Sequence, residues 1–177
     1  MNHDDNSAPQ SVLNPNSIAF IALCKEYCQA LAQAREAQRD EFISLMLKLL
    51  PRIYITATDL SVNFIETEEP YIDPALEEDY YEGIRRNVET LMGPDDIYLE
   101  VFEEDMKYSD TPVSASIAEG LADLFQVLFN FISALGNDPT DEVAAMSVLA
   151  IKEDFRNYWS RILCNVLRPL NDLAYKD

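Results

Sequence analysis

The sequence contains a single histidine, His3, and only four glycines among 177 residues. Histidine is the usual general base and metal ligand near neutral pH, and His3 stands in a polar N-terminal stretch without helical periodicity. This excludes Ser-His-Asp and Cys-His catalysis and the histidine-bearing di-iron sites of helical bundles. The four glycines never cluster, which excludes a phosphate-cradling loop and a dinucleotide-binding fingerprint. These absences argue against catalytic activity, and we expect no cofactor.

Basic residues are also scarce, because 13 Lys and Arg stand against 32 Asp and Glu, for a formal net charge of −19. A charge of this sign repels nucleic-acid phosphates and anionic lipid headgroups, so we expect neither nucleic acid nor a membrane as a partner. The longest apolar stretch, Ile117 to Leu135, contains Glu119 and Asp123, and placing such acids in lipid costs several kcal/mol.

Cysteine is limited to Cys24, Cys28 and Cys164. At helical spacing, Cys24 and Cys28 hold their Cβ atoms roughly 5–6 Å apart, whereas a disulfide needs about 4 Å. Free thiols suit a reducing compartment, and the polar stretch Met1–Pro15 does not resemble a signal peptide, so we expect a cytoplasmic protein. No fourth metal ligand is evident beside the thiols, and we expect all three cysteines to fill the core.

Apolar residues recur at helical spacing from residue 16 onward. The pattern predicts helices over residues 17–37, 40–60, 73–92 and 114–135, and a last helix that starts near 138–140. Pro51 interrupts the second stripe, but the stripe continues in register, which indicates a kinked helix rather than two helices. We therefore predict an all-α fold, a bundle of about five to six helices with a long Pro51-kinked second helix and a long C-terminal helix. Residues 1–15 would form a flexible tail and residues 16–177 a single domain.

The helix predicted over residues 114–135 carries the clearest end signals. Ser116 and Glu119 form the pattern of a capping box, and Gly136 follows the last apolar residue. Upstream of it, Ile97–Phe102 alternates between apolar and polar residues like a short strand. Because no second strand is evident, we predict an extended linker there.

Some of these segments resemble a known family. The run Ser116-Ile-Ala-Glu-Gly-Leu-Ala-Asp-Leu-Phe125, followed by Phe155-Arg-Asn-Tyr-Trp159, resembles an uncharacterised bacterial family described as a domain of unknown function. Leu49-Leu-Pro-Arg-Ile-Tyr54 and Tyr98-Leu-Glu-Val-Phe102 are similar to it too. The resemblance covers roughly Ser17 to Tyr175. It implies an all-helical fold and supplies no catalytic residue.

Carboxylates offer the one remaining route to catalysis. Glu119 and Asp123 stand four residues apart on the polar strip of an apolar helix, where they could hold a divalent metal. Helical nucleotide pyrophosphohydrolases use such pairs at a spacing of three, so a metal-dependent hydrolase is our second hypothesis. The alternative is that Glu119 caps its helix while Asp123 contacts water or a base such as Lys152 or Arg156.

The middle third of the chain concentrates the negative charge, with 17 acidic and three basic residues between Ser61 and Glu119. Acids steer a basic partner and tyrosines supply rigid contact area, so our first hypothesis is a non-enzymatic module that binds an unidentified, basic protein. The alternative is a solvated face that keeps the protein dissolved. The candidate partner-binding residues are Glu66, Glu68, Glu69, Tyr71, Glu77, Glu78, Tyr80 and Tyr81.

Aromatic residues cluster at helical spacing in two of the predicted helices. We predict that Phe155, Tyr158 and Trp159 lie in the core, since aromatics at helical spacing usually pack. The excess of apolar side chains around Phe125 and Phe129 suggests a homodimer seam as an alternative to burial within one chain. Binding of a small apolar ligand between helices is a third functional hypothesis, which depends on a cavity.

Overall fold

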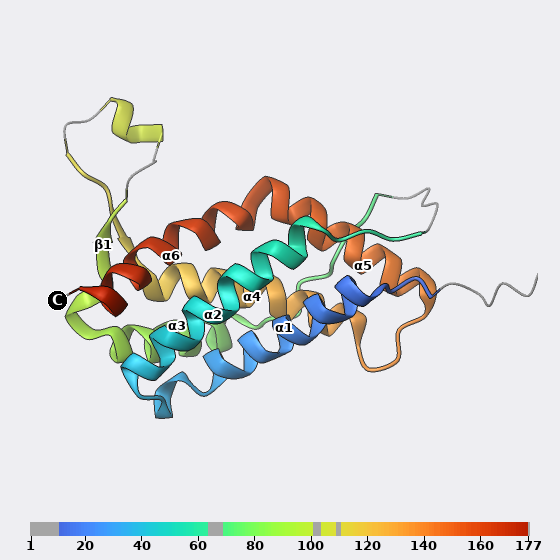
Figure 1. The fold of residues 1–177 in the computed structure, drawn as a ribbon, viewed down its shortest axis with the longest axis horizontal. Helices are drawn as coiled ribbons and strands as arrows, with labels where there is room; N and C mark the ends of the chain where they lie inside the picture. The colour runs from blue at the N-terminus through green and yellow to red at the C-terminus, as the bar shows by residue number, and fades with distance from the viewer. Residues whose placement is uncertain (1–10, 64–68, 101–103, 109–110, 177) are drawn as a thin grey trace, which may run out of the picture.

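Helices dominate the computed structural model, which describes residues 11–63, 69–100, 104–108 and 111–176 (Figure 1). The predicted all-α bundle is confirmed. Within the described residues the six α-helices are α1 (Pro15–Ala32), α2 (Arg39–Thr58), α3 (Glu78–Met92), α4 (Ile117–Leu135), α5 (Asp141–Asp154) and α6 (Ser160–Tyr175).

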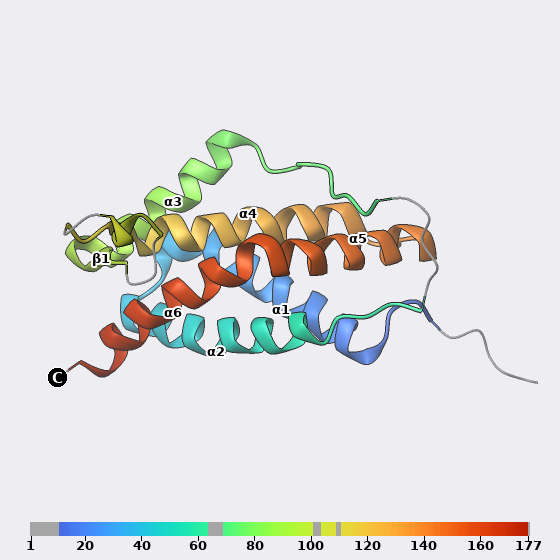
Figure 2. The same cartoon turned by 90° about the horizontal axis from the view of Figure 1, so that it is seen from above.

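The most apolar helix, α4, lies in the middle of the bundle and contacts α1, α3, α5 and α6. Figure 2 shows α3 on one side of α4, with α1 and α2 on the other. By length and composition alone α4 could also cross a membrane. Here its apolar side chains pack on the surrounding helices, as expected for a helix that is apolar on most of its circumference.

The predicted end signals of α4, Ser116 and Gly136, are confirmed, although the helix begins at Ile117 and not at Ser114. The Ser116 hydroxyl accepts a hydrogen bond from the Glu119 amide at 3.1 Å, and Gly136 ends the helix with a φ of 64°. A second cap comes from the buried Asp96, whose carboxylate accepts from the Ala118 amide at 2.7 Å and from the Ser116 hydroxyl at 2.6 Å. A carboxylate at this position also interacts favourably with the helix dipole.

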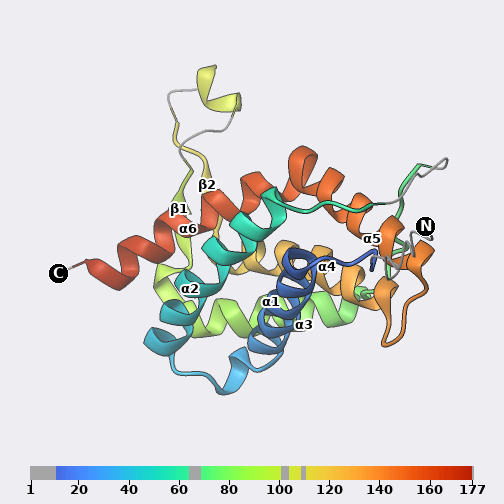
Figure 3. The same ribbon diagram turned by 45° about the vertical axis from the view of Figure 1, so that its right-hand side comes forward.

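The predicted linker after α3 is wrong in part, because its first residues form a strand. β1 (Ile97–Leu99) pairs antiparallel with β2 (Ser114–Ser116), so that Ile97 faces Ser116 and Leu99 faces Ser114. The prediction had assigned the β2 residues to the start of α4. Arg168 of α6 holds this two-stranded ribbon, since it donates to the Leu99 carbonyl at 2.6 Å and lies over the Tyr98 ring. Figure 3 shows the ribbon projecting from the bundle beside α6.

The first helix begins earlier than predicted. Asn14 caps α1 by accepting from the Ser17 amide at 2.9 Å, and Val12 is buried in the core. Residues 12–15, which were assigned to the tail, therefore pack with the bundle. His3 lies outside the described residues.

The second and last helices follow the predicted pattern. Helix α2 continues through Pro51 to Thr58, as the uninterrupted apolar stripe indicated. At the C-terminal end, α5 and α6 are joined without a break by a π-helical turn, Phe155–Trp159, which makes one long helix. Trp159 is fully buried and donates from its indole nitrogen to the Ile151 carbonyl at 3.2 Å. Phe155 is buried as well, but Tyr158 is 46 % exposed, so the core prediction is wrong for this tyrosine.

Helix α3 starts at Glu78 and not at Asp73. The Asn130 side chain of α4 explains the difference, because its Oδ1 accepts from the amides of Ala75 and Leu76, both at 2.9 Å. These hydrogen bonds hold the residues before α3 in a non-helical conformation alongside α4.

Candidate functional site

The two acids of the predicted metal site lie one turn apart on α4 but have different surroundings. Glu119 is exposed, whereas Asp123 is half-buried and accepts a hydrogen bond of 2.6 Å from the Tyr81 hydroxyl. The predicted basic partners, Lys152 and Arg156, form no ion pair with either acid among the described residues. Nor do the described His, Cys, Asp and Glu side chains include a group of three or more that could hold a metal ion.

The hydrogen bond between Tyr81 and Asp123 links α3 to α4. Burial raises the pKa of Asp123 above its ordinary value, and the hydrogen bond from Tyr81 offsets part of this rise. Burial and the adjacent Asp123 carboxylate likewise raise the pKa of Tyr81. Tyr81 therefore stays protonated over the physiological range and donates a hydrogen bond between the two helices, and its role in binding a partner stays a prediction.

Tyr80, the residue before Tyr81, covers the aromatic patch that suggested a homodimer seam. Its ring lies edge-on to Phe125 and Phe129, with centroid distances of 5.6 and 5.8 Å. Phe125 is only 1 % exposed. The chain thus covers much of this patch with its own side chain, and a homodimer stays a prediction.

The other candidate partner-binding residues that the structure describes lie on the outside of the molecule. Tyr71 is 67 % exposed, and Glu69, Glu77 and Glu78 are exposed too, while Glu66 and Glu68 fall outside the described residues. We name as the acidic surface the exposed residues Glu69, Tyr71, Asp73, Glu77, Glu78, Asp79 and Tyr80. Within the described part of the chain, none of its five carboxylates forms an ion pair. The next acid along the chain, Glu82, does form one, with Arg85 at 3.1 Å.

A groove lies at one end of the acidic surface. It runs between the segment before α3, the end of α4 and the first two turns of α5, and its volume is about 470 Å³. Sequence reasoning did not identify it, because its walls come from three separate parts of the chain. The lining residues are Tyr71, Asp73, Ala75, Ser133, Ala134, Glu142, Val143, Met146 and Ser147.

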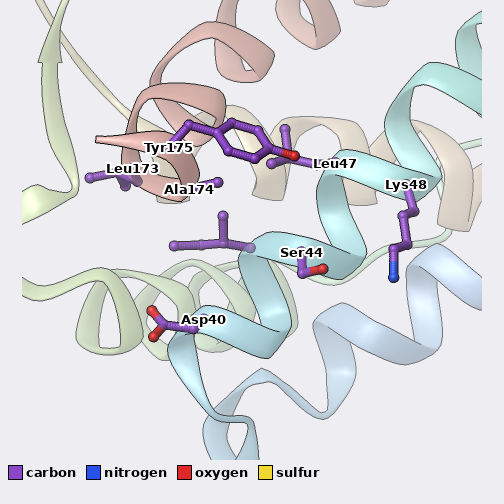
Figure 4. Close-up of a pocket in the computed structure, with 8 residues that line it drawn as sticks. Asp40, Ser44, Leu47, Lys48, Leu173, Ala174 and Tyr175 are labelled. Carbon is purple, nitrogen blue, oxygen red and sulfur yellow. The ribbon is translucent and has the colours of Figure 1, made fainter. Parts of the chain in front are cut away.

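A second hollow, of about 390 Å³, lies between α2 and the end of α6 (Figure 4). The exposed ring of Tyr175 lies over it, near Leu47 and Ala174. Its charged lining residues are Asp40 and Lys48, which favour neither sign of ligand charge. This is a location for the predicted small apolar ligand, which stays a prediction.

The cysteines are all free thiols, as predicted from their spacing. Burial raises the pKa of Cys24 well above its ordinary value and that of Cys28 to about 12. Both are therefore poor nucleophiles at neutral pH. Cys164 is exposed, so the prediction that all three cysteines fill the core is wrong for this residue.

The fold and these surfaces define a helical bundle with an acidic, tyrosine-bearing side, in whose described residues no group of three or more potential metal ligands lies together. The chain belongs to the family described as Domain of unknown function (DUF5063), whose model matches residues 11–176. The predicted resemblance to such a family is confirmed. The chain is also similar to the crystal structure of protein BF1032 from Bacteroides fragilis, a structural genomics target, with 27 % identity and a TM-score of 0.77 over 95 % of this chain and 98 % of that chain. No curated protein matches the sequence.

Proposed function

We propose that this protein is a non-enzymatic interaction module that binds a basic protein partner through its acidic surface. The observation that carries the proposal is the set of five exposed carboxylates that form no ion pair within the described chain. When a carboxylate is paired with an arginine, the positive charge cancels much of its electrostatic field. These five instead project an uncompensated negative potential, which attracts lysine and arginine side chains of a partner.

The tyrosines add the contact area that charge alone does not supply. Tyr71 is 67 % and Tyr80 44 % exposed, and both belong to the acidic surface. Tyrosine is enriched at protein interfaces because a rigid ring buries a large area at a small entropic cost. Charges then increase the rate of association, while the rings slow dissociation.

The experiment compares the wild-type chain with a variant in which Glu69→Gln, Glu77→Gln and Glu78→Gln are combined. A control variant carries the same charge change on other faces, through Glu26→Gln, Asp59→Asn and Glu153→Gln, all at exposed positions. Each protein is immobilised, exposed to a bacterial lysate at low and moderate salt, and its captured proteins are quantified by mass spectrometry.

We expect the wild type and the control variant to capture the same basic proteins, and the acidic-surface variant to lose them at moderate salt. Thermal unfolding of all three proteins verifies that the substitutions leave the fold intact. Identical captured proteins for the wild type and the acidic-surface variant at both salt concentrations would refute the proposal.

The metal-dependent hydrolase, our second hypothesis, stays a prediction and has its own test. Calorimetric titration with magnesium and manganese should release heat if Glu119 and Asp123 bind a divalent ion. No heat at millimolar metal would remove that hypothesis.

A further inference from the structure

One wall of the groove beside the acidic surface is stiff. Two prolines, Pro70 and Pro74, flank Tyr71, and a residue that precedes proline is restricted to extended conformations. Just beyond them, the Asn130 side chain accepts hydrogen bonds from Ala75 and Leu76. The segment therefore loses little conformational entropy when a ligand binds against it.

The side chains of this wall alternate as in a strand. Tyr71, Asp73 and Ala75 line the groove, whereas Ile72 and Leu76 pack against the hydrophobic core. The backbone amides and carbonyls of Tyr71, Ile72 and Asp73 form no hydrogen bond with other described residues. They are free to pair with another extended chain, which is how sheet edges accept peptides.

The opposite wall and the floor supply an apolar pocket. Val143 and Met146 lie on the first two turns of α5, and Val143 is 40 % exposed. Ala134 on α4 forms part of the floor, and its methyl side chain leaves space above it for a ligand. The groove volume of about 470 Å³ is in the range of ligand sites, roughly 300–1,000 Å³.

The charge of the groove selects its occupant. Asp73 and Glu142 stand on opposite walls, and its described lining includes no lysine or arginine. The other carboxylates of the acidic surface, Glu69, Glu77, Glu78 and Asp79, are exposed and stand before and after Asp73 in the same stretch of chain. An occupant needs an aliphatic or aromatic side chain for the pocket and positive charges for its rims.

We propose that this groove, called here the Tyr71 groove, binds a short extended segment of a basic protein. An apolar side chain of that segment would lie against Val143 and Met146, and its lysine or arginine side chains beside Asp73 and Glu142. This inference rests on the proposed function, since it assigns the partner's docking point on the acidic side of the molecule.

The experiment selects peptides from a random library displayed on phage, using the immobilised full chain. Enriched peptides are synthesised with a fluorescent label, and their affinities are measured by fluorescence polarisation. We expect enrichment of sequences that combine lysine or arginine with aliphatic or aromatic residues. Enrichment of acidic peptides, or none at all, would contradict the inference.

Matched variants then locate the binding site. Tyr71→Ala should weaken binding of the selected peptides by about tenfold, whereas Tyr108→Ala, at a tyrosine that is 90 % exposed elsewhere, should change it by less than about twofold. Glu142→Gln should weaken it by about threefold, and Glu153→Gln, an exposed acid later on α5, should not. Equal binding by Tyr71→Ala and the wild type would overturn the Tyr71 groove.

The lysate experiment separates this failure from a failure of the proposed function. If Tyr71→Ala captures the wild-type set of proteins while the Glu69, Glu77 and Glu78 variant loses them, the groove is wrong and the acidic surface still binds. If neither variant loses a captured protein, both proposals are wrong.

Discussion

At the scale of single residues, Asp123 is an acid whose environment opposes its charge. It is half-buried on the central helix, and its described hydrogen-bond partner is the Tyr81 hydroxyl. A hydrogen bond to a charged group contributes about 1.5–3 kcal/mol, and partial exposure places this one toward the lower end. Its contribution is to hold α3, and with it the acidic surface, against α4.

The substitution Asp123→Asn keeps an acceptor for Tyr81 and removes the charge. Burial raises the pKa of Asp123, so the folded protein binds the proton more tightly than the unfolded chain does. Protonation therefore stabilises the wild type below the ordinary aspartate pKa, and this stabilisation is lost as pH rises through the raised pKa. We expect the variant to be at least as stable as the wild type at neutral pH, with a difference that shrinks toward about pH 4. Urea unfolding across this pH range measures it.

Tyr81→Phe is the companion variant, since it removes the donor and leaves the carboxylate charged. It should lower the free energy of unfolding by about 1.5 kcal/mol at neutral pH. A difference between Asp123→Asn and the wild type that grows as pH falls would contradict the assigned direction of the pKa shift.

Thiol reactivity gives a second prediction at this scale. Burial raises the pKa of all three thiols, but Cys164 is exposed, whereas Cys24 is buried and Cys28 is half-buried. An aromatic disulfide reagent should label one thiol rapidly in the folded protein and all three after denaturation. In Cys164→Ser the rapid phase should disappear. Rapid labelling of that variant would show that the bundle opens around α1.

At the scale of elements, the sequence predicts what local pattern determines. Helical periodicity located all the long helices, and the cap signals Ser116 and Gly136 were identified, although the helix was predicted to start at Ser114 and begins at Ile117. The start of α3 and the pairing of β1 with β2 were missed. Both depend on residues distant in sequence, namely Asn130 for the segment before α3 and Ser114–Ser116 for β1.

Two helical glycines should respond in opposite ways to alanine. A Cβ atom at Gly120 of α4 would lie 2.4 Å from a methyl of Val166 on α6, whereas one at Gly83 of α3 would meet nothing within 4 Å. Gly120→Ala should therefore destabilise the protein by about 1–3 kcal/mol. Gly83→Ala should stabilise it by about 0.5–1 kcal/mol, because alanine has the higher helix propensity. Chemical denaturation measures both changes.

The combination Gly120→Ala with Val166→Ala tests the cause of the first effect. If the clash with Val166 is the cause, the double variant should lose less stability than the sum of the two single variants. Strict additivity would show that the two helices do not depend on this close approach.

At the scale of the whole molecule, the acidic surface could be predicted and the groove could not. The excess of acids between Ser61 and Glu119 is visible in composition. The groove exists only because folding brings Tyr71, Ala134 and Val143 together, and no spacing rule links these positions. Tyr71 and Tyr81 stand in the same acidic stretch of the sequence, which does not distinguish them. Only the structure shows that Tyr81 donates a hydrogen bond to Asp123.

The net charge of −19 predicts how salt affects stability. Like charges repel within the folded chain, and salt screens this repulsion. The melting temperature should rise as sodium chloride increases from about 0.02 M to about 0.5 M, and the rise should be smaller for the Glu69, Glu77 and Glu78 variant. Differential scanning calorimetry measures both. A melting temperature that falls with salt would mean that ion pairs outweigh the repulsion.

The π-helical turn at Phe155–Trp159 has a consequence for how this chain can change in evolution. Such a turn holds roughly one residue more than an α-helical turn, and each residue rotates a helix by about 100°. Before it, α5 packs on α4, and after it, α6 packs on both α2 and α4. Losing one codon at this turn would convert it to an ordinary α-helical turn and leave the buried stripe of α6 facing α2 and α4, whereas losing one codon within α5 would rotate that stripe by about 100° toward water.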